Sequence, residues 1–290
     1  MKAKPSTIAQ KVVTVILAGL CAMTGPTSAE DLKPKTVEAF DHYVQLTEAQ
    51  IASELARREP YLWVEGLPGD RSAADEAQLY AGHVVIERLD TLDPGDNGKL
   101  ITVSDGMIHH WIGTVFIHGA TLPQTLSLEE DYDHQQDYFR PDVMRSKVLR
   151  HNGNDFTVEL RLYKKKVITT VLDTEHEVHY TLVDSTHAWS RSRTTRIQEV
   201  YNAGEKDERL ESAGRDRGFL WRMNTYWRFE EKDGGTYVEC QSISLTRAIP
   251  AGLGWLIGPY VTSVPRESLT FTLATTRSAV LRRITSRAAP

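Results

Sequence analysis

The residues that could carry acid–base or metal chemistry in this chain are few and scattered. His109 and His110 are adjacent within an apolar run typical of a strand. Adjacent strand residues point to opposite faces, so this pair cannot converge on one metal ion. Asp131, Asp133 and His134 form a second group, in which helical spacing brings Asp131 near His134, but a helix cap and a surface pair explain it as well. The sequence has no paired Cys/His metal spacing, phosphate loop or nucleophile elbow, so we assign no catalytic residue and expect no metal or cofactor.

Two arginines offer a different kind of chemistry. Strand alternation places Arg191 and Arg193 on one face. An arginine that reaches into an apolar cavity could hold the acidic head of a ligand through a bidentate contact. The alternative is pairing across the sheet with the acidic residues Glu175, Glu177 and Glu199.

The segment 219–229 predicts an aromatic wall for a cavity. Trp221, Met223 and Trp227 alternate with polar residues and should share one face of a strand. In the next segment Cys240 and Ser242 share one parity, and small side chains opposite large aromatic ones leave space for a ligand. The alternative is that the C-terminal helix simply fills this space as core. The other face, with Arg222, Arg228 and Glu239, is expected to be a solvated ladder of charges.

A long amphipathic helix is predicted to close that wall. Residues 269–284 repeat apolar side chains at spacings of three and four, and Leu269 and Leu273 should lie above the aromatic strand. The glycine- and proline-rich apolar segment 252–260 comes before this helix. We interpret it as a buried crossing, with a gate or a peripheral membrane contact as the alternative.

The first 29 residues have the form of a signal peptide. Three lysines precede a twelve-residue apolar run, Val12 to Met23, and Thr27-Ser28-Ala29 supplies small residues for cleavage before Glu30. Twelve residues are too few to span a bilayer, which needs about 20. We therefore expect a periplasmic or secreted protein. Cleavage changes the net charge from −5 to −8, which argues against nucleic-acid binding. It also leaves one cysteine, which excludes an internal disulfide.

The remaining chain divides into two predicted parts. Residues 30–104 are an accessory segment: a helix over about 37–57, a polar loop at 66–72, and short strands at 79–89 and 99–103. Residues 105–290 form the main domain. Its predicted order is a strand at 109–117, two short helices that begin near Thr121 and Asp133, six strands, and the long helix.

This order resembles the START-like superfamily, also called SRPBCC or helix-grip, which includes polyketide cyclases. The resemblance also rests on Asp131-Tyr-Asp133 and on Arg247-Ala-Ile-Pro250 leading to Pro265-Arg-Glu-Ser268, and it points to secreted bacterial members of unassigned function. It implies an α+β fold in which a curved antiparallel sheet wraps around the long C-terminal helix. It further implies a cavity between sheet and helix for a lipid, sterol, quinone or polyketide, with catalysis in only a minority of members.

Three hypotheses for function follow. The first is a periplasmic or secreted protein that binds or shuttles a hydrophobic small molecule. The second is a cyclase or dehydratase that would use His110, Arg191 or Arg193, and the third is an envelope protein that presents the helix near 37–57 to a partner. Under the first, the expected ligand-binding residues are His110, Arg191, Arg193, Trp221, Met223, Trp227, Cys240, Ser242, Leu269 and Leu273.

Overall fold

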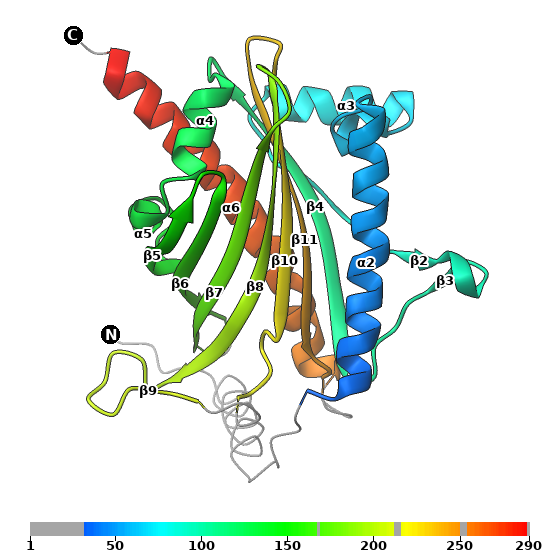
Figure 1. The fold of residues 1–290 in the computed structure, drawn as a ribbon, viewed down its shortest axis with the longest axis vertical. Coiled ribbons are helices and arrows are strands. Elements are labelled where there is room, and N and C mark those ends of the chain that lie inside the picture. Colours follow the sequence, from blue (N-terminus) through cyan, green and yellow to red (C-terminus); the bar gives the residue numbers. More distant parts are fainter. Residues whose placement is uncertain (1–31, 167–168, 212–215, 250–253, 289–290) are drawn as a thin grey trace, which may run out of the picture.

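The structure is a computed structural model that describes residues 32–166, 169–211, 216–249 and 254–288. Its centre is a curved antiparallel sheet of nine strands in the order β1-β4-β11-β10-β8-β7-β6-β5, with β9 paired to β8 (Figure 1). A separate two-stranded ribbon pairs β2 with β3. The strands are β1 (Val85–Arg88), β2 (Leu92–Asp93), β3 (Lys99–Leu100), β4 (Gly106–His118), β5 (Val143–Asn152), β6 (Asp155–Lys165), β7 (Thr169–Leu182), β8 (His187–Tyr201), β9 (Arg209–Leu210), β10 (Arg222–Lys232) and β11 (Gly235–Arg247).

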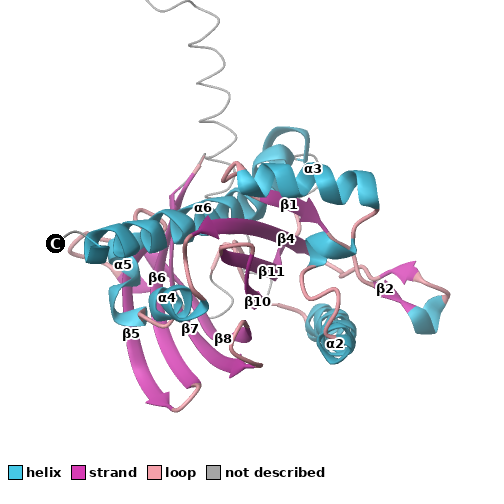
Figure 2. Cartoon of the chain, turned by 90° about the horizontal axis from the view of Figure 1, so that it is seen from above, coloured by secondary structure: helices cyan, strands magenta, loops and turns pink. Residues whose placement is uncertain are grey.

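Two long helices cover opposite faces of the sheet. Helix α6 (Gly254–Ala288) crosses one face, and α2 (Pro34–Arg57) runs along the other beside β4 (Figures 1 and 2). The remaining helices are α3 (Gly69–Tyr80), α4 (Leu122–Glu129), α5 (Gln135–Tyr138) and the 3-10 turns η2 (Trp63–Gly66), η3 (Pro94–Asp96) and η4 (Tyr132–His134). The predicted helix-grip α+β fold is confirmed.

The first short helix begins where the sequence predicts. Thr121 and Gln124 form the capping box, because the Gln124 amide donates to the Thr121 hydroxyl and the Thr121 amide donates to the Gln124 side chain. The next predicted cap is wrong. Asp133 lies inside η4, and its carboxylate instead accepts a hydrogen bond of 2.8 Å from the amide of Val148.

Helix α6 packs directly on the centre of the sheet. Leu273 and Val280 are buried against Val115 and Phe229 of the strands. Gly113 of β4 permits this close approach, because a Cβ there would lie 2.8 Å from the Leu273 side chain. Burial of this apolar stripe is the main force that holds the helix on the sheet.

Helix α2 buries its apolar stripe on the opposite face. Phe40, Val44 and Ile51 are 2–7% exposed and pack in one cluster with Ile243 and Leu245 of β11. These side chains are therefore engaged with the sheet. The hypothesis that this helix offers an apolar stripe to an envelope partner is not supported.

Two elements differ from the sequence-based prediction. Helix α3 occupies residues expected to be a polar loop and the start of a strand, because only Leu79 in it is buried and its apolar period is therefore weak. Helix α6 begins at Gly254, so it includes Pro259 and Pro265. Each proline removes one intrahelical hydrogen bond without ending the helix. The side chains of Trp255, Leu256, Ile257 and Tyr260, on which the gate alternative depends, lie outside the described residues.

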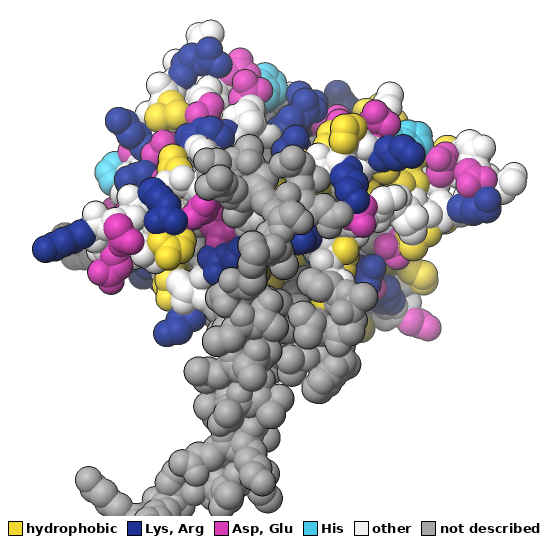
Figure 3. Space-filling model, turned by 90° about the horizontal axis from the view of Figure 1, so that it is seen from below, with side chains coloured by type: hydrophobic (Ala, Val, Ile, Leu, Met, Phe, Trp, Pro, Cys, Tyr) yellow, Lys and Arg dark blue, Asp and Glu magenta, His cyan; other side chains and the backbone are white. Residues whose placement is uncertain are grey.

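The surface of the described chain is mixed in charge. On the face shown in Figure 3, basic and acidic side chains intermingle with single hydrophobic ones. Among the described residues, no helix is both long enough and apolar enough to cross a bilayer.

Candidate functional site

The candidate site is a cavity of about 480 Å³ between α6 and the concave face of the sheet. This volume lies within the usual range for small-molecule pockets. Its walls are the inward-facing residues of alternating strands, because every second side chain of a strand points to the same face. The strand residues that line it are Val143, Val158, Leu160, Leu162, Tyr163, Lys164, Thr170, Leu172, His176, Val178, Tyr180, Ser190, Ser192, Met223, Thr225, Trp227, Cys240, Ser242, Ser244 and Thr246.

The cavity has a buried end and a half-exposed end. Val158, Val178 and Tyr180 at one end are 1–7% exposed. At the other end, the lining includes partly exposed residues of the first half of α6, such as Val264 and Pro265. Ten residues of β7 separate Tyr180 from Thr170, which corresponds to about 33 Å of strand. The site is therefore elongated along the strands.

Charged side chains at the half-exposed end are paired. Lys164 Nζ lies 2.7 Å from Asp142 Oδ2, and Lys166 forms an ion pair with Glu267 of α6. The first pair joins the end of β6 to the residue before β5, and the second joins the residue after β6 to the helix. Because they are partly exposed, each is worth little in stability.

A small polar group interrupts the apolar wall at the buried end. Glu129, from the last turn of α4, is 6% exposed, and its Oε1 accepts a hydrogen bond of 2.9 Å from Thr276 of α6. Burial raises the pKa of its carboxyl to about 7. The hydroxyls of Tyr132 and Tyr180 lie 2.7 Å apart in the same wall, and burial raises the pKa of both.

Two further titratable groups in the lining are held neutral. Burial lowers the pKa of His176 to about 4, and its ring nitrogens contact Thr174 and Ser192 at 2.9 and 3.4 Å. Burial, with a smaller effect of Glu129, raises the pKa of Cys240 well above its ordinary value. A neutral imidazole and a protonated thiol suit an apolar occupant better than an ion.

Half of the residues predicted to bind a ligand line this cavity. They are Met223, Trp227, Cys240, Ser242 and Leu269. Trp227 lies opposite Cys240 in the β10–β11 ladder, and Ser242 lies opposite Thr225. The predicted combination of large aromatic and small side chains is therefore present.

Two predicted residues lie next to the cavity rather than on its wall. Leu273 is fully buried at Gly113, within the core. Trp221 was expected to bracket the cavity with Trp227, and this is wrong. It comes one residue before β10 begins, outside the regular alternation, and its indole packs with the apolar cluster under α2 and donates to Asp216 at 3.3 Å.

The other three predicted residues lie on the opposite face of the sheet. The prediction that His110 lines the ligand cavity is wrong: its ring contacts the Tyr43 hydroxyl at 2.8 Å and the Gln241 amide at 2.7 Å, and burial lowers its pKa to about 3. Arg191 and Arg193 also fail to reach the cavity, because the parity of β8 points them toward Glu48 of α2, at 3.8 and 3.7 Å.

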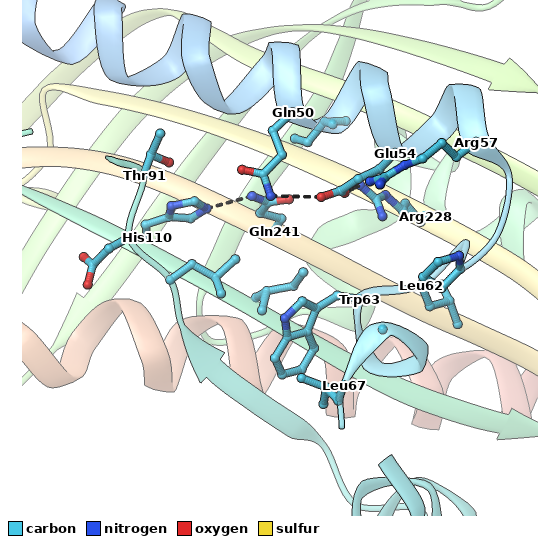
Figure 4. A pocket seen from close by; sticks show the side chains of 16 residues that line it. Gln50, Glu54, Arg57, Leu62, Trp63, Leu67, Thr91, His110, Arg228 and Gln241 are labelled. Carbon is cyan, nitrogen blue, oxygen red and sulfur yellow. Dashed lines mark hydrogen bonds and ion pairs between the residues drawn. The ribbon is translucent and has the colours of Figure 1, made fainter. Parts of the chain in front are cut away.

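His110 instead lines a second cavity of about 360 Å³ under α2 (Figure 4). Its polar groups pair with one another: Figure 4 shows His110 bonded to Gln241, and Gln50 bonded to Glu54. Arg228 donates to Glu54 at the same site. This pairing gives the second cavity a mainly structural character.

The expected solvated ladder of charges is also wrong. Arg228 and Glu239 do pair in register across β10 and β11, with 3.8 Å between Nη1 and Oε1. They are 5% and 1% exposed, because α2 and the segment before η2 cover them. The Trp63 amide donates to Glu239, and Arg228 donates to the carbonyl of Tyr61.

The Asp131 and His134 pair has a structural role. The two side chains lie 2.6 Å apart, as helical spacing predicts, and the His134 side chain is 60% exposed. Asp131 also pairs with Arg283 near the end of α6 and accepts a hydrogen bond from Tyr138. Together these contacts fasten the short helices to α6. Among the described residues, no group of three His, Cys, Asp or Glu side chains is placed to hold a metal ion.

Sequence reasoning missed the buried polar end of the cavity. The signal for β7 was present, since His176, Val178 and Tyr180 share one parity and acidic residues occupy the other. Glu129 also had a signal, because it lies four residues after Thr125 on the buried face of α4. A charged residue at an apolar helix position indicates a special environment.

A search of solved structures returned proteins of low overall similarity to this chain. A STAR-related lipid transfer protein from Xanthomonas axonopodis is 17% identical, with a TM-score of 0.40 over 62% of this chain and 95% of that chain. Human STARD10 is 8% identical, with a TM-score of 0.42 over 75% and 83% of the two chains. The Zhui aromatase/cyclase from Streptomyces is 12% identical, with a TM-score of 0.36 over 61% and 96%.

At these identities the likeness concerns the fold alone. No family model matches the sequence, and a search of curated proteins found no match. The order of elements decides the architecture: β4, two short helices, six long strands with the two-residue β9 among them, and a long C-terminal helix across the concave face. The fold is a START-like helix-grip.

Proposed function

We propose that this protein binds a hydrophobic small molecule, such as a lipid, quinone or polyketide-like compound, in the cavity under α6. One observation carries the proposal. The cavity of about 480 Å³ is walled mainly by apolar side chains of the strands and α6, and it remains open beside a helix that could have filled it. An apolar space of this size favours an apolar occupant, because burial of the ligand removes its surface from water.

We further propose that the protein acts as a carrier in the periplasm or outside the cell, after cleavage of residues 1–29. The signal-peptide pattern supports this location. Amino-terminal sequencing of the protein from its own envelope fraction tests it, with Glu30 as the expected first residue. Flotation with vesicles tests whether delivery includes peripheral membrane contact.

The central experiment asks whether the cavity binds apolar molecules. The purified protein is titrated with Nile red, a neutral apolar fluorophore, and the dye is then displaced with fatty acids, phospholipids and quinones. Solvent extraction of the natively purified protein, followed by mass spectrometry, identifies any copurified ligand. The proposal fails if no dye binds, no ligand copurifies and none of these compounds raises the melting temperature.

The enzyme alternative loses its candidate groups. His110, Arg191 and Arg193 were the residues through which a cyclase or dehydratase would act, and all three lie on the face opposite the cavity. Glu129 is the buried acid that does line the cavity.

A further inference from the structure

Glu129 is a buried carboxyl group with few hydrogen bonds to its side chain. Thr276 donates one hydrogen bond to Oε1. In the part of the chain that the structure describes, this is the one hydrogen bond to the Glu129 carboxyl, and no lysine, arginine or histidine pairs with the group. The residue also belongs to the cavity wall, so its carboxyl group borders the space in which a ligand would lie.

Two tyrosines lie beside this carboxyl, and half-buried Glu130 is a second acid near them. Burial is the main cause of the raised pKa of Tyr132 and Tyr180, and the charge of Glu129 adds to it, so the three side chains lie close together. Gln135, 8% exposed, completes this end of the wall and donates to the carbonyl of Glu129. An anionic ligand group would meet a carboxyl and two tyrosines here, with no cation to offset the loss of its hydration.

The lysines of the cavity are at the other end. Lys164, near the end of β6, and Lys166, just after the strand, are already paired with Asp142 and Glu267. The wall between the two ends is apolar for most of its length. The cavity therefore distinguishes the two ends of an elongated ligand.

We propose that Glu129, with Tyr132 and Tyr180, binds the uncharged hydroxyl or carbonyl end of an elongated apolar molecule. The apolar body of the ligand then lies along β7 toward the half-exposed end. This inference rests on the proposed function and narrows it to one class of ligand, neutral amphiphiles that enter with the polar end first. A protonated carboxyl suits this role because it can donate to a carbonyl and accept from a hydroxyl.

The test compares ligands that differ only in their polar head group, on proteins that differ only at residue 129. Displacement of Nile red by decan-1-ol, decane and decanoate is measured on the whole protein and on its Glu129→Leu and Glu129→Gln variants. Leucine removes the polar partner, whereas glutamine keeps a neutral donor and acceptor of the same shape. Comparing the change for the alcohol with the change for the alkane isolates the head-group contact from effects on the cavity.

We expect Glu129→Leu to lower the affinity for decan-1-ol by about 5- to 30-fold, which corresponds to the loss of one buried hydrogen bond. The affinity for decane should be nearly unchanged. Glu129→Gln should retain most of the alcohol affinity. Decanoate, measured at a pH at which it is ionised, should not depend on residue 129.

Two results would overturn the inference while the proposed function stands, provided that Nile red binds. In the first, Glu129→Leu leaves the affinity for decan-1-ol unchanged. In the second, Glu129→Leu lowers the affinity for decanoate as much as the affinity for the alcohol. A wild-type protein that binds neither Nile red nor decane contradicts the proposed function itself, and this inference with it. Because the leucine variant must still bind Nile red, misfolding cannot imitate the expected result.

Discussion

At the scale of single residues, Ser242 offers the sharpest distinction between a pocket and a packed core. Its side chain lines the cavity on β11, opposite Thr225. Ser242→Trp should fill the space, leave stability nearly unchanged and reduce ligand affinity by on the order of tenfold or more, about 1.4 kcal/mol. Urea unfolding and Nile red titration measure the two quantities.

The matched control for this substitution is Ser278→Trp, on the exposed side of α6. It adds the same indole outside the cavity and should change neither quantity. If Ser242→Trp instead destabilises the protein by about 1–3 kcal/mol and the parent binds nothing, the space is ordinary packed core.

A second residue-scale prediction concerns Glu129 and pH. Burial raises its pKa in the folded protein from 4.5 to about 7, so between these values the folded state binds more protons than the unfolded state. Stability contributed by the protonated group is complete below pH 4.5 and is lost as pH rises through 7, by about 2–4 kcal/mol. Glu129→Gln removes this dependence.

The measurement is the difference in unfolding free energy between the wild type and Glu129→Gln from pH 4.5 to 8. Glu239, whose pKa burial also raises to about 7, is present in both proteins, so its effect cancels in the difference. A difference that does not vary with pH would show that the Glu129 carboxyl is solvated, and would weaken the assignment of this end of the cavity.

At the scale of elements, helix α2 and the pair beneath it depend on each other. Arg228 and Glu239 are buried by α2 and by the segment before η2, and they tie this segment to the sheet. Arg228→Leu leaves buried carboxylates without their cation and should cost about 3–5 kcal/mol. Replacing both Arg228 and Glu239 with leucine should restore much of that loss, because the buried Glu239 is then gone and Glu54, whose side chain is 26% exposed, can be hydrated.

The control is Arg193→Leu, which breaks a pair with Glu48 on the same face of the sheet. The Arg193 side chain is 51% exposed, so this change should cost less than about 1 kcal/mol. Denaturant unfolding of the four proteins decides the matter. Equal losses for Arg228→Leu and Arg193→Leu would mean that water reaches the pair under α2.

The same elements show what a sequence can and cannot predict. Alternation placed Met223, Trp227, Cys240 and Ser242 on the face that lines the cavity, because parity along a strand is a local property. Trp221 failed because it lies just outside the strand, where alternation no longer holds. The cover over the second face depends on contacts between residues more than 150 positions apart, and a local pattern does not carry that information.

At the scale of the whole molecule, the two long helices give the sheet two different faces. The α2 face contains the polar second cavity of about 360 Å³, whereas the α6 face contains the larger apolar one. The candidate site could therefore be located from sequence, because the C-terminal helix and the alternation of side chains along the strands are both visible there. Its polar end could not, because Glu129 reaches the cavity through the packing of α4 on α6.

This division also predicts how ligand binding should affect the melting temperature. A ligand that binds only the folded state stabilises it by RT ln(1 + [L]/Kd), about 2.7 kcal/mol at one hundred times Kd. For a domain of this size, 1 kcal/mol corresponds to about 2–4 °C, so a saturating neutral amphiphile such as decan-1-ol should raise the melting temperature by about 5–11 °C. Calorimetry or thermal fluorescence measures the shift. Ser242→Trp should abolish it and Ser278→Trp should preserve it, because only the first fills the space under α6. A shift that survives Ser242→Trp would place the ligand elsewhere, and the cavity under α2, lined by His110 and Gln241, would then be the site to examine.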